Sequence, residues 1–398
     1  MATIRWGTDV GADVCLPFVG NSVLDAARYI GAGDPDDDVA LAWNEFASDV
    51  NTVGLWHGNE GTGTLVADAS GQINGTLQGD QSANWLLPGW LGSAALAPNG
   101  AASIAVLGAG AAYAGAVSGV PDFCFEAWLR WDALPSSFDF IAACTWDWWD
   151  YGNWHVRIRD ERNLYFALSV GGNALTELGA MTFITDALLG TWVHLCCEKS
   201  GTARTIYRNG TAVASDMVAG DVSIYDAGVL FPYGAIHGIK FRRSYDQNPV
   251  HFGDEYRLSN VARYSADFSP TRYPASGTVV AVTPLALPRT INAIAWAATT
   301  GVDIGDVYQI HVNTGTDLSP VWTQVGGDNP TSPITPIGLA TTAADLVRVT
   351  LTPGFDATLS ATLQNETPVL DWLEVDWAAV GGARAQYPRL SYGHLIGG

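Results

Sequence analysis

Residues 146–154 read Trp-Asp-Trp-Trp-Asp-Tyr-Gly-Asn-Trp, a dense group of side chains that could bind a ligand. Flat aromatic rings stack on the apolar faces of sugar rings, Asp and Asn bond hydroxyl groups, and Trp and Tyr anchor protein interfaces. The alternative is that these large rings cap one end of a hydrophobic core. The candidate ligand-binding residues are Trp146, Trp148, Trp149, Tyr151, Asn153 and Trp154.

Catalytic patterns are missing from the sequence. A glucanase would carry Glu-x-Asp-x-x-Glu on one strand, so that alternate carboxylates converge as nucleophile, helper and acid. No such string occurs, and the nearest approach, Glu374-Val375-Asp376, lacks the third carboxylate. The seven histidines have no metal-ligand spacing, and neither a Gly-x-Ser-x-Gly motif nor a phosphate-binding loop occurs. We therefore expect that the protein is not an enzyme.

The composition predicts the structural class. The chain of 398 residues contains 44 Gly and 19 Pro, and 48% of its residues are hydrophobic. Long amphipathic periods are absent, so short strands joined by tight turns are expected. Residues 123–131 alternate strongly, which is the pattern of a central strand with one face in a sandwich core. The chain is predicted to be all-β.

Several short motifs follow one another in a fixed order. Asp68-Ala69-Ser70-Gly71 predicts a tight turn after a short strand, and Asn74-Gly75 and Asn209-Gly210 predict hairpin turns. Phe-Cys-Phe-Glu-Ala-Trp at 123–128, Trp-Val-His-Leu at 192–195 and Gly-Asp-Glu-Tyr-Arg-Leu-Ser-Asn at 253–260 complete the series. In this order the motifs resemble the laminin-G/pentraxin-like branch of the concanavalin A-like lectin/glucanase superfamily over residues 53–270, of the type found in phage structural proteins.

The resemblance implies a fold and a metal. The fold is an antiparallel jelly-roll sandwich of the concanavalin A-like, laminin-G-like type. Members often hold a structural Ca²⁺ with the Asp of the Asp-x-Ser-Gly turn and the Asp of the closing strand, which correspond to Asp68 and Asp254. The alternative is an Asx-turn for Asp68 and a solvated Asp254, or one paired with Arg257. Glu126 could be a catalytic carboxylate, but family members without enzymatic activity also carry a Glu at the corresponding position.

The rest of the chain divides around this segment. Residues 1–52 are acidic and poorly periodic and are interpreted as an N-terminal arm, with one or two helical turns allowed at Val23–Tyr29. Residues 271–290, which carry Pro274, Pro284 and Pro288 just after Pro270, are predicted to be a linker. Five predicted strands in 291–378 indicate a second, smaller β-sandwich, which resembles a module of phage structural and secreted glycan-binding proteins. The Gly-rich tail 379–398 is expected to lie along a neighbour.

Charge and cysteines limit the function further. The formal charge is −21, which repels phosphate backbones, so nucleic acid binding is not expected. No run of ~18 apolar residues and no secretion signal is recognised, so we expect no membrane insertion and folding in a cytoplasm. The five cysteines show no metal spacing and are expected to be buried thiols, with Cys196 and Cys197 facing opposite sides of a strand.

These observations favour a non-enzymatic phage virion protein, such as a head decoration, spike or tail fibre component. It would be made in the host cytoplasm and act in the virion outside the cell. The expected partners are cell-surface carbohydrate, other virion proteins and further copies of the chain. The alternatives are a bacterial extracellular glycan-binding protein and a degenerate glycoside hydrolase.

Overall fold

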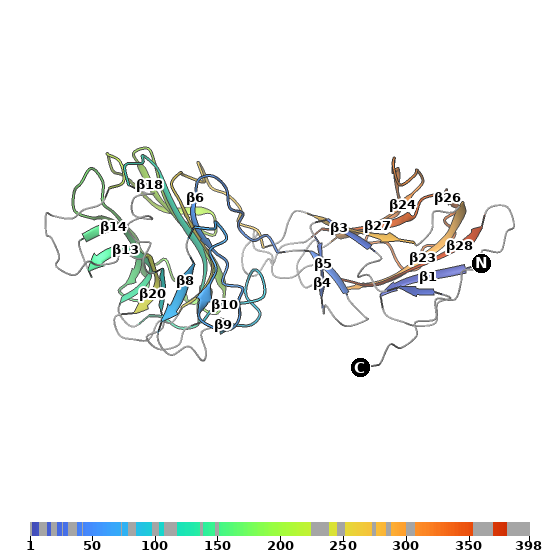
Figure 1. Ribbon diagram of the computed structural model, residues 1–398, viewed down its shortest axis with the longest axis horizontal. Coiled ribbons are helices and arrows are strands. Elements are labelled where there is room, and N and C mark those ends of the chain that lie inside the picture. The colour runs from blue at the N-terminus through green and yellow to red at the C-terminus, as the bar shows by residue number, and fades with distance from the viewer. Residues whose placement is uncertain are drawn as a thin grey trace. The chain divides into compact units, whose positions relative to one another are not determined.

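The protein is all-β, as predicted. The computed structural model describes residues 2–7, 14–16, 22–25, 27–30, 38–41, 43–72, 74–78, 85–97, 103–106, 118–135, 138–147, 151–223, 239–244, 251–272, 276–283, 288–299, 307–352 and 369–379 (Figure 1). Strands dominate these residues, and their one helical element is a 3-10 turn, η1 (Asp186–Leu188). No helix in this part of the chain is long and apolar enough to cross a membrane.

The chain forms two compact units, and one is inserted into the other in sequence. Unit 1 comprises Met1–Ala42 and Tyr273–Gly398, and unit 2 comprises Trp43–Arg272. The two ends of unit 2 lie together, because Asn44 N donates to Arg272 O at 2.8 Å and Asn44 Nδ2 to Thr271 Oγ1 at 2.9 Å. Adjacent ends let a domain be inserted at one point of a host chain.

Unit 2 contains two eight-stranded antiparallel sheets. The first sheet has the order β19-β18-β17-β12-β21-β10-β9, and β6 also pairs with β21. Its strands are β6 (Thr52–Trp56), β9 (Trp85–Leu86), β10 (Ala95–Leu96), β12 (Phe123–Trp131), β17 (Trp192–Ser200), β18 (Ala203–Arg208), β19 (Thr211–Met217) and β21 (His251–Ser259).

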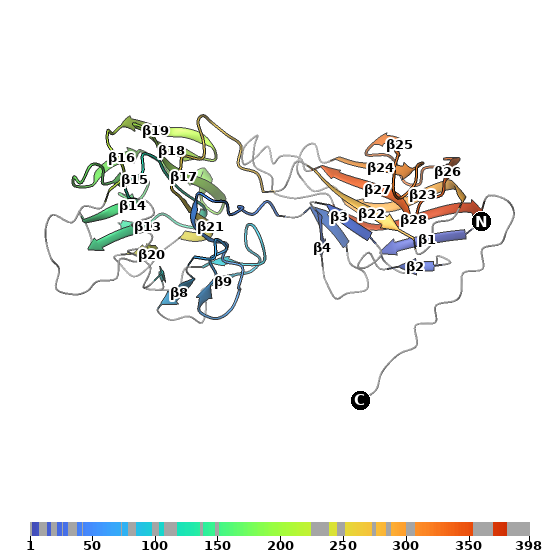
Figure 2. The ribbon, with the colours of Figure 1, turned by 45° about the horizontal axis from the view of Figure 1, so that its top comes forward.

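The second sheet has the order β16-β15-β14-β13-β20-β11-β8-β7. Figure 2 shows β14, β15 and β16 side by side in this sheet. Its strands are β7 (Leu65–Val66), β8 (Gly75–Gln78), β11 (Ser103–Val106), β13 (Phe138–Asp147), β14 (Tyr151–Arg159), β15 (Asn163–Leu168), β16 (Thr176–Ala180) and β20 (Ile239–Ser244).

Strand β12 shows how the core of unit 2 is built. Its predicted apolar face, including Phe125 and Leu129, belongs to the main hydrophobic cluster together with Val156 and Phe166 of the second sheet. The opposite face of β12 is buried as well, with Glu126 and Trp128 at 0% and 1% exposure. A strand of a sandwich that is buried on both faces must be covered from outside by other parts of the chain.

Unit 1 also contains two sheets. A seven-stranded sheet has the order β2-β1-β28-β23-β26, with β5 and β4 beside β28, and a five-stranded sheet has the order β25-β24-β27-β22-β3. The strands are β1 (Ala2–Gly7), β2 (Val14–Leu16), β3 (Ser22–Asp25), β4 (Ala27–Ile30), β5 (Asp38–Leu41), β22 (Gly277–Val282), β23 (Arg289–Thr299), β24 (Val307–Asn313), β25 (Trp322–Asp328), β26 (Leu339–Thr341), β27 (Asp345–Thr352) and β28 (Val369–Ala379).

The N-terminal residues correct the predicted division of the chain. Strand β1 pairs antiparallel with β28 from Ala2↔Trp377 to Gly7↔Trp372, and β3 pairs with β22. Residues 1–52 are therefore not a separate arm, and Val23–Tyr29 contributes to strands rather than to a helical turn. The predicted linker 271–290 contains β22, which pairs with β27 as well. Residues 380–398, most of the predicted tail, lie outside the described residues.

Candidate functional site

The predicted aromatic stretch joins two neighbouring strands, as expected. Strands β13 and β14 form an antiparallel pair whose last matched residues are Thr145↔Gly152 and Asp147↔Tyr151. The backbones of Trp146, Tyr151 and Asn153 belong to these strands. The side chains of these three residues, and Trp148 and Trp149 altogether, lie outside the described residues. We call residues 146–154 the aromatic hairpin.

Trp154 has a different role from the one predicted. Its side chain is 0% exposed and its ring centroid lies 5.3 Å from that of Phe123 and 5.2 Å from that of Phe125. Residues 154, 156 and 158 of β14 all point into the core, because side chains alternate along a strand. The prediction that Trp154 contacts a ligand is therefore wrong, and the core-capping alternative applies to this residue.

The other face of β14 carries a charged network. Glu177 of β16 accepts hydrogen bonds from Arg157 Nη2 and from His155 Nε2, the latter at 3.3 Å, and Arg159 Nη1 lies 3.5 Å from Glu177 Oε2. The Arg159 guanidinium also lies over the Tyr165 ring, 3.9 Å from its centroid. Burial opposes ionisation, but the His155 hydrogen bond and the charge of Arg157 lower the pKa of Glu177 to about 2. The network therefore ties β14, β15 and β16 together.

Asp68 occupies the turn that the sequence predicts. Its Oδ1 accepts hydrogen bonds from Leu55 N at 3.0 Å, Ser70 N at 2.8 Å and Ser70 Oγ at 2.7 Å. These contacts close an Asx-turn and fasten it to β6. Asp68 therefore has the contacts that the Asx-turn alternative expected.

Asp254 is buried in β21. Its Oδ2 accepts from Trp90 N at 2.9 Å and Leu91 N at 3.0 Å, whereas its Oδ1 has no hydrogen-bond partner among the described residues. Burial and the neighbouring Glu255 raise the pKa of Asp254 well above its usual value. Arg257 pairs with Glu126 instead, so the solvated or Arg257-paired alternative for Asp254 is wrong.

The fit of these two residues to Ca²⁺ is partial. A hard cation takes six to eight oxygen ligands, and the free Oδ1 of Asp254 fits that role. The described His, Cys, Asp and Glu residues form one group of at least three that could hold a metal, and it contains neither Asp68 nor Asp254. The Ca²⁺ site stays a prediction.

Glu126 lies in a buried polar cluster on the outer face of the first sheet. Its Oε1 accepts from Arg257 Nε at 2.8 Å and Nη2 at 2.6 Å, and its Oε2 from Tyr264 OH at 2.7 Å. His194 Nε2 lies 3.2 Å from the same Oε2. Burial opposes ionisation, but His194 and Arg257 lower the pKa of Glu126 to about 2. An enclosed carboxylate with a pKa near 2 holds no proton near neutral pH that a general acid could donate.

Two segments at the ends of unit 2 cover this cluster. The Phe46 ring meets His194 edge-on at 5.8 Å and lies under the Arg257 guanidinium at 4.5 Å. Tyr264 and Phe268 stack at 3.5 Å, and the Phe268 ring lies 5.6 Å from His194. No short sequence pattern predicts this arrangement, because Phe46, His194 and the Tyr264–Phe268 stack come from distant parts of the chain.

The family comparison decides the nature of unit 2. Residues 108–238, which lie within this unit, match a laminin-G family model described as concanavalin A-like lectin/glucanases superfamily. Unit 2 is a concanavalin A-like, lectin-like domain. The resemblance that the sequence motifs carried is confirmed for this domain. The search of curated proteins found no match to the chain.

The solved structures that match the chain share little sequence with it. The botulinum neurotoxin serotype D binding domain has a TM-score of 0.38 and 12% identity, over 70% of this chain and 69% of its own. The binding domain of botulinum neurotoxin DC in complex with SialylT has 0.38 and 16%, over 53% and 48%. Trypanosoma rangeli sialidase has 0.36 and 12%, over 55% of this chain and 32% of its own length. At such TM-scores these likenesses carry no argument about ligand or activity.

Proposed function

We propose that the protein is a non-enzymatic structural and adhesion protein of a phage particle, whose lectin-like domain contacts cell-surface glycan. The observation that carries the glycan part is the position of the aromatic hairpin. It forms the end of β13 and β14 in a concanavalin A-like domain, where connections between strands commonly provide binding residues. The hairpin supplies aromatic rings, carboxylates and an amide within nine residues.

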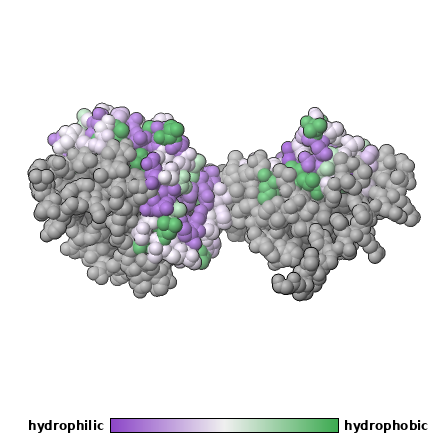
Figure 3. Space-filling view, in the orientation of Figure 1, coloured by the Kyte–Doolittle hydropathy of each residue, from purple (hydrophilic) through white to green (hydrophobic). Residues whose placement is uncertain are grey.

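The base of the hairpin is held by core packing and by contacts with Glu177. Trp154 is locked in the core, and the next residues in the strand, His155 and Arg157, are held by Glu177 across β15. A fixed base reduces the entropy lost when the hairpin binds a ligand, so more of the contact energy appears as affinity. On the face of the domain that Figure 3 shows, the coloured residues are mainly purple and white with a few green spots.

The absence of catalysis is part of the same proposal. Glu126 is enclosed and ionised, and the Glu374-Val375-Asp376 pair lies on β28 in unit 1, outside the lectin-like domain. Retaining and inverting glycosidases both need a protonated acid beside a second carboxylate. The virion part is supported by the resemblance of residues 291–378 to a module of phage structural and secreted glycan-binding proteins. Other virion proteins and further copies of the chain are the proposed partners.

The glycan part is tested by binding of the full chain to a glycan array. The double variant W148A/W149A should lose binding by more than about tenfold, because stacking on aromatic rings supplies much of the contact area. The control is Trp322→Ala, which removes a partly exposed Trp of unit 1 that stacks under Arg348 at 4.8 Å. No binding to any glycan, or equal binding by the double variant, would contradict the glycan part.

The virion part has its own test. An antibody against the chain, used with purified phage particles from the source culture, should label one structure on intact particles in electron micrographs. A protein found only in particle-free supernatant would be a secreted glycan-binding protein instead.

A further inference from the structure

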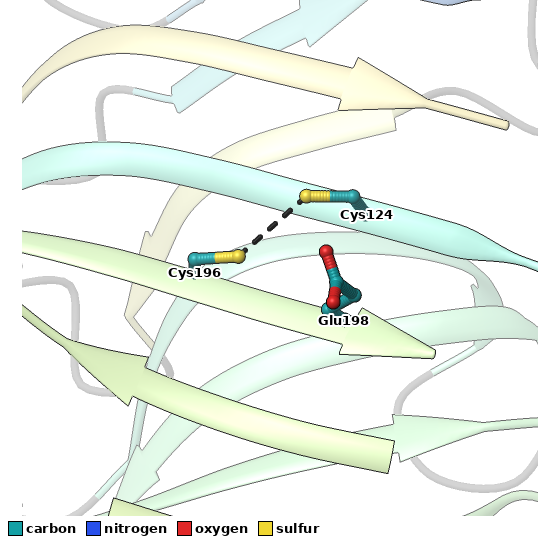
Figure 4. Close-up of side chains that lie close together, drawn as sticks. All are labelled: Cys124, Cys196 and Glu198. Atoms are coloured by element: carbon teal, nitrogen blue, oxygen red, sulfur yellow. Dashed lines mark hydrogen bonds between the residues drawn. The ribbon is translucent and has the colours of Figure 1, made fainter. Parts of the chain in front are cut away.

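Two thiols and a carboxylate meet on the covered outer face of the first sheet. Cys124 Sγ and Cys196 Sγ lie 3.6 Å apart, and the ligand atoms of Cys124, Cys196 and Glu198 all lie within 4.8 Å of one another (Figure 4). The three residues are 1%, 0% and 2% exposed. We call them the Cys2Glu cluster.

Strand register brings the cluster together. Cys124 of β12 is paired with Glu198 of β17, and Glu126 with Cys196, so the side chains of these four residues share one face. Cys197 points to the other face and belongs to the hydrophobic core, as the sequence predicted for the adjacent pair. Because 72 residues separate Cys124 from Cys196, the sequence showed no metal spacing.

The distance between the sulfurs fits a shared metal ion better than a disulfide. Zn–S bonds of about 2.3 Å at a tetrahedral angle hold two sulfurs about 3.8 Å apart. A disulfide brings them to about 2.0 Å. Cys124 and Cys196 are diagonal neighbours across the sheet, an arrangement whose backbone separation of about 7–8 Å exceeds the usual disulfide range. Binding a metal ion therefore requires a smaller movement of the two cysteines than forming a disulfide does.

We infer that Cys124, Cys196 and Glu198 bind a Zn²⁺ ion as a closed structural site. Two thiolates and a carboxylate suit this borderline-soft cation, and burial on all sides is typical of structural rather than catalytic zinc. Glu126 Oε1 lies 3.9 Å from Cys124 Sγ but is paired with Arg257, so the three residues of the cluster are the protein ligands. This inference is independent of glycan binding.

Burial and neighbouring charge determine the protonation of the Cys2Glu cluster. Burial raises the pKa of both thiols and of Glu198, and the nearby Glu126 raises them further. Without a cation the thiols therefore keep their protons beside the buried Glu198, whereas Glu126 is already paired with Arg257. Zn²⁺ would displace about two protons and offset the negative charge, so its affinity should rise about 100-fold per pH unit below the thiol pKa values.

The surroundings orient the carboxylate and close the site. Glu198 Oε2 accepts from Arg263 N at 2.6 Å and Tyr264 N at 2.8 Å, which holds its side chain in place. Tyr264 and Phe268 pack against the two cysteines and Tyr207. The ion would enter before the segment 260–268 closes during folding, and a chelator should remove it slowly from the native chain.

The experiment uses the full chain, refolded under reducing conditions with Zn²⁺ or Co²⁺ and freed of excess metal. We expect one ion per chain by elemental analysis, release of about two protons on binding, and a thiolate-to-cobalt charge-transfer band with tetrahedral d–d bands. C124A, C196A and Glu198→Gln should each weaken binding by more than about 100-fold. Cys197→Ala is the matched control, because it removes the neighbouring core thiol and leaves all three ligands in place.

Circular dichroism of each metal-free variant identifies failures of folding. In denaturant that partly unfolds the metal-free chain, Zn²⁺ should slow the alkylation of Cys124 and Cys196, which tests the site without any variant. Substoichiometric metal, cobalt spectra without thiolate bands, or full binding by the folded C124A/C196A double variant would overturn the inference. A Cys124–Cys196 disulfide in peptide maps of the protein as isolated would overturn it as well.

Discussion

The two faces of the β12–β17 sheet are equally buried but are stabilised by different interactions. The inner face packs Phe125, Leu129 and Leu195 against the second sheet. The outer face encloses Glu126, His194 and Arg257 under segments from both ends of the domain. Apolar contacts depend on area and volume, whereas enclosed charges depend on every partner being present. The outer face therefore specifies which segments cover the sheet. Its weakness is that the loss of one partner leaves a buried charge without its counter-charge.

The largest effect is expected from removing one charge of the outer face. Arg257→Met leaves Glu126 buried without its main counter-charge, which should cost ~3–5 kcal/mol of unfolding free energy. Phe125→Ala on the inner face should cost a similar ~3–5 kcal/mol through lost packing. Chemical denaturation of the full chain followed by Trp fluorescence measures both.

The control for this comparison is Arg130→Ala. Arg130 pairs with Asp132 at the surface, with side chains 29% and 48% exposed, and should cost less than ~1 kcal/mol. The comparison fails if Arg257→Met is as mild as this control.

Lowering the pH should weaken the stabilising interactions of the outer face and leave those of the inner face unchanged. The pKa of Glu126 is lowered to about 2 in the folded chain, so its stabilising contribution is present above its ordinary value of 4.5 and is lost as the pH falls from 4.5 toward about 2. The loss should amount to about 3 kcal/mol. Denaturation curves at pH 7, 4 and 3 should show a smaller acid loss for Glu126→Gln, whereas Phe125→Ala should retain the full pH dependence.

Calcium tests the buried Asp254. If its free Oδ1 binds Ca²⁺, added calcium at about 100 times the Kd should stabilise the chain by about 2.7 kcal/mol. Asp254→Asn should abolish this gain, and without calcium it should be neutral or stabilising at pH 7, because the raised pKa of Asp254 shows that its charged form is disfavoured. Exposed Asp132→Asn is the control. Equal calcium responses in both variants would exclude Asp254 as a ligand.

The smallest effect on stability is expected at the aromatic hairpin. W148A/W149A should change the unfolding free energy by less than ~1 kcal/mol if both side chains are exposed. Trp154 is fully buried, so Trp154→Ala should lower the unfolding free energy by ~3–5 kcal/mol. Thermal melts of both variants decide this. A destabilised double variant would mean that the hairpin caps the core along its whole length.

The sequence by itself determined the local features of this protein. Strong alternation assigned the inner face of β12, the Asp68 turn has the predicted contacts, and Asn209-Gly210 forms a two-residue hairpin turn with φ of 51° and 77°. Alternation and turn chemistry act over a few residues, so they can be read without knowing what lies nearby in space.

Only the tertiary structure decided which distant residues meet. The pairing of β1 with β28, the contacts of Phe46 with Arg257 and of Tyr264 with Glu126, and the meeting of Cys124 with Cys196 all join residues far apart in the chain. The same limit explains Trp154, whose residue type fits a sugar platform or a core equally well. Such contacts follow from strand register and sheet order, which depend on the free energy of the whole fold rather than on any short pattern.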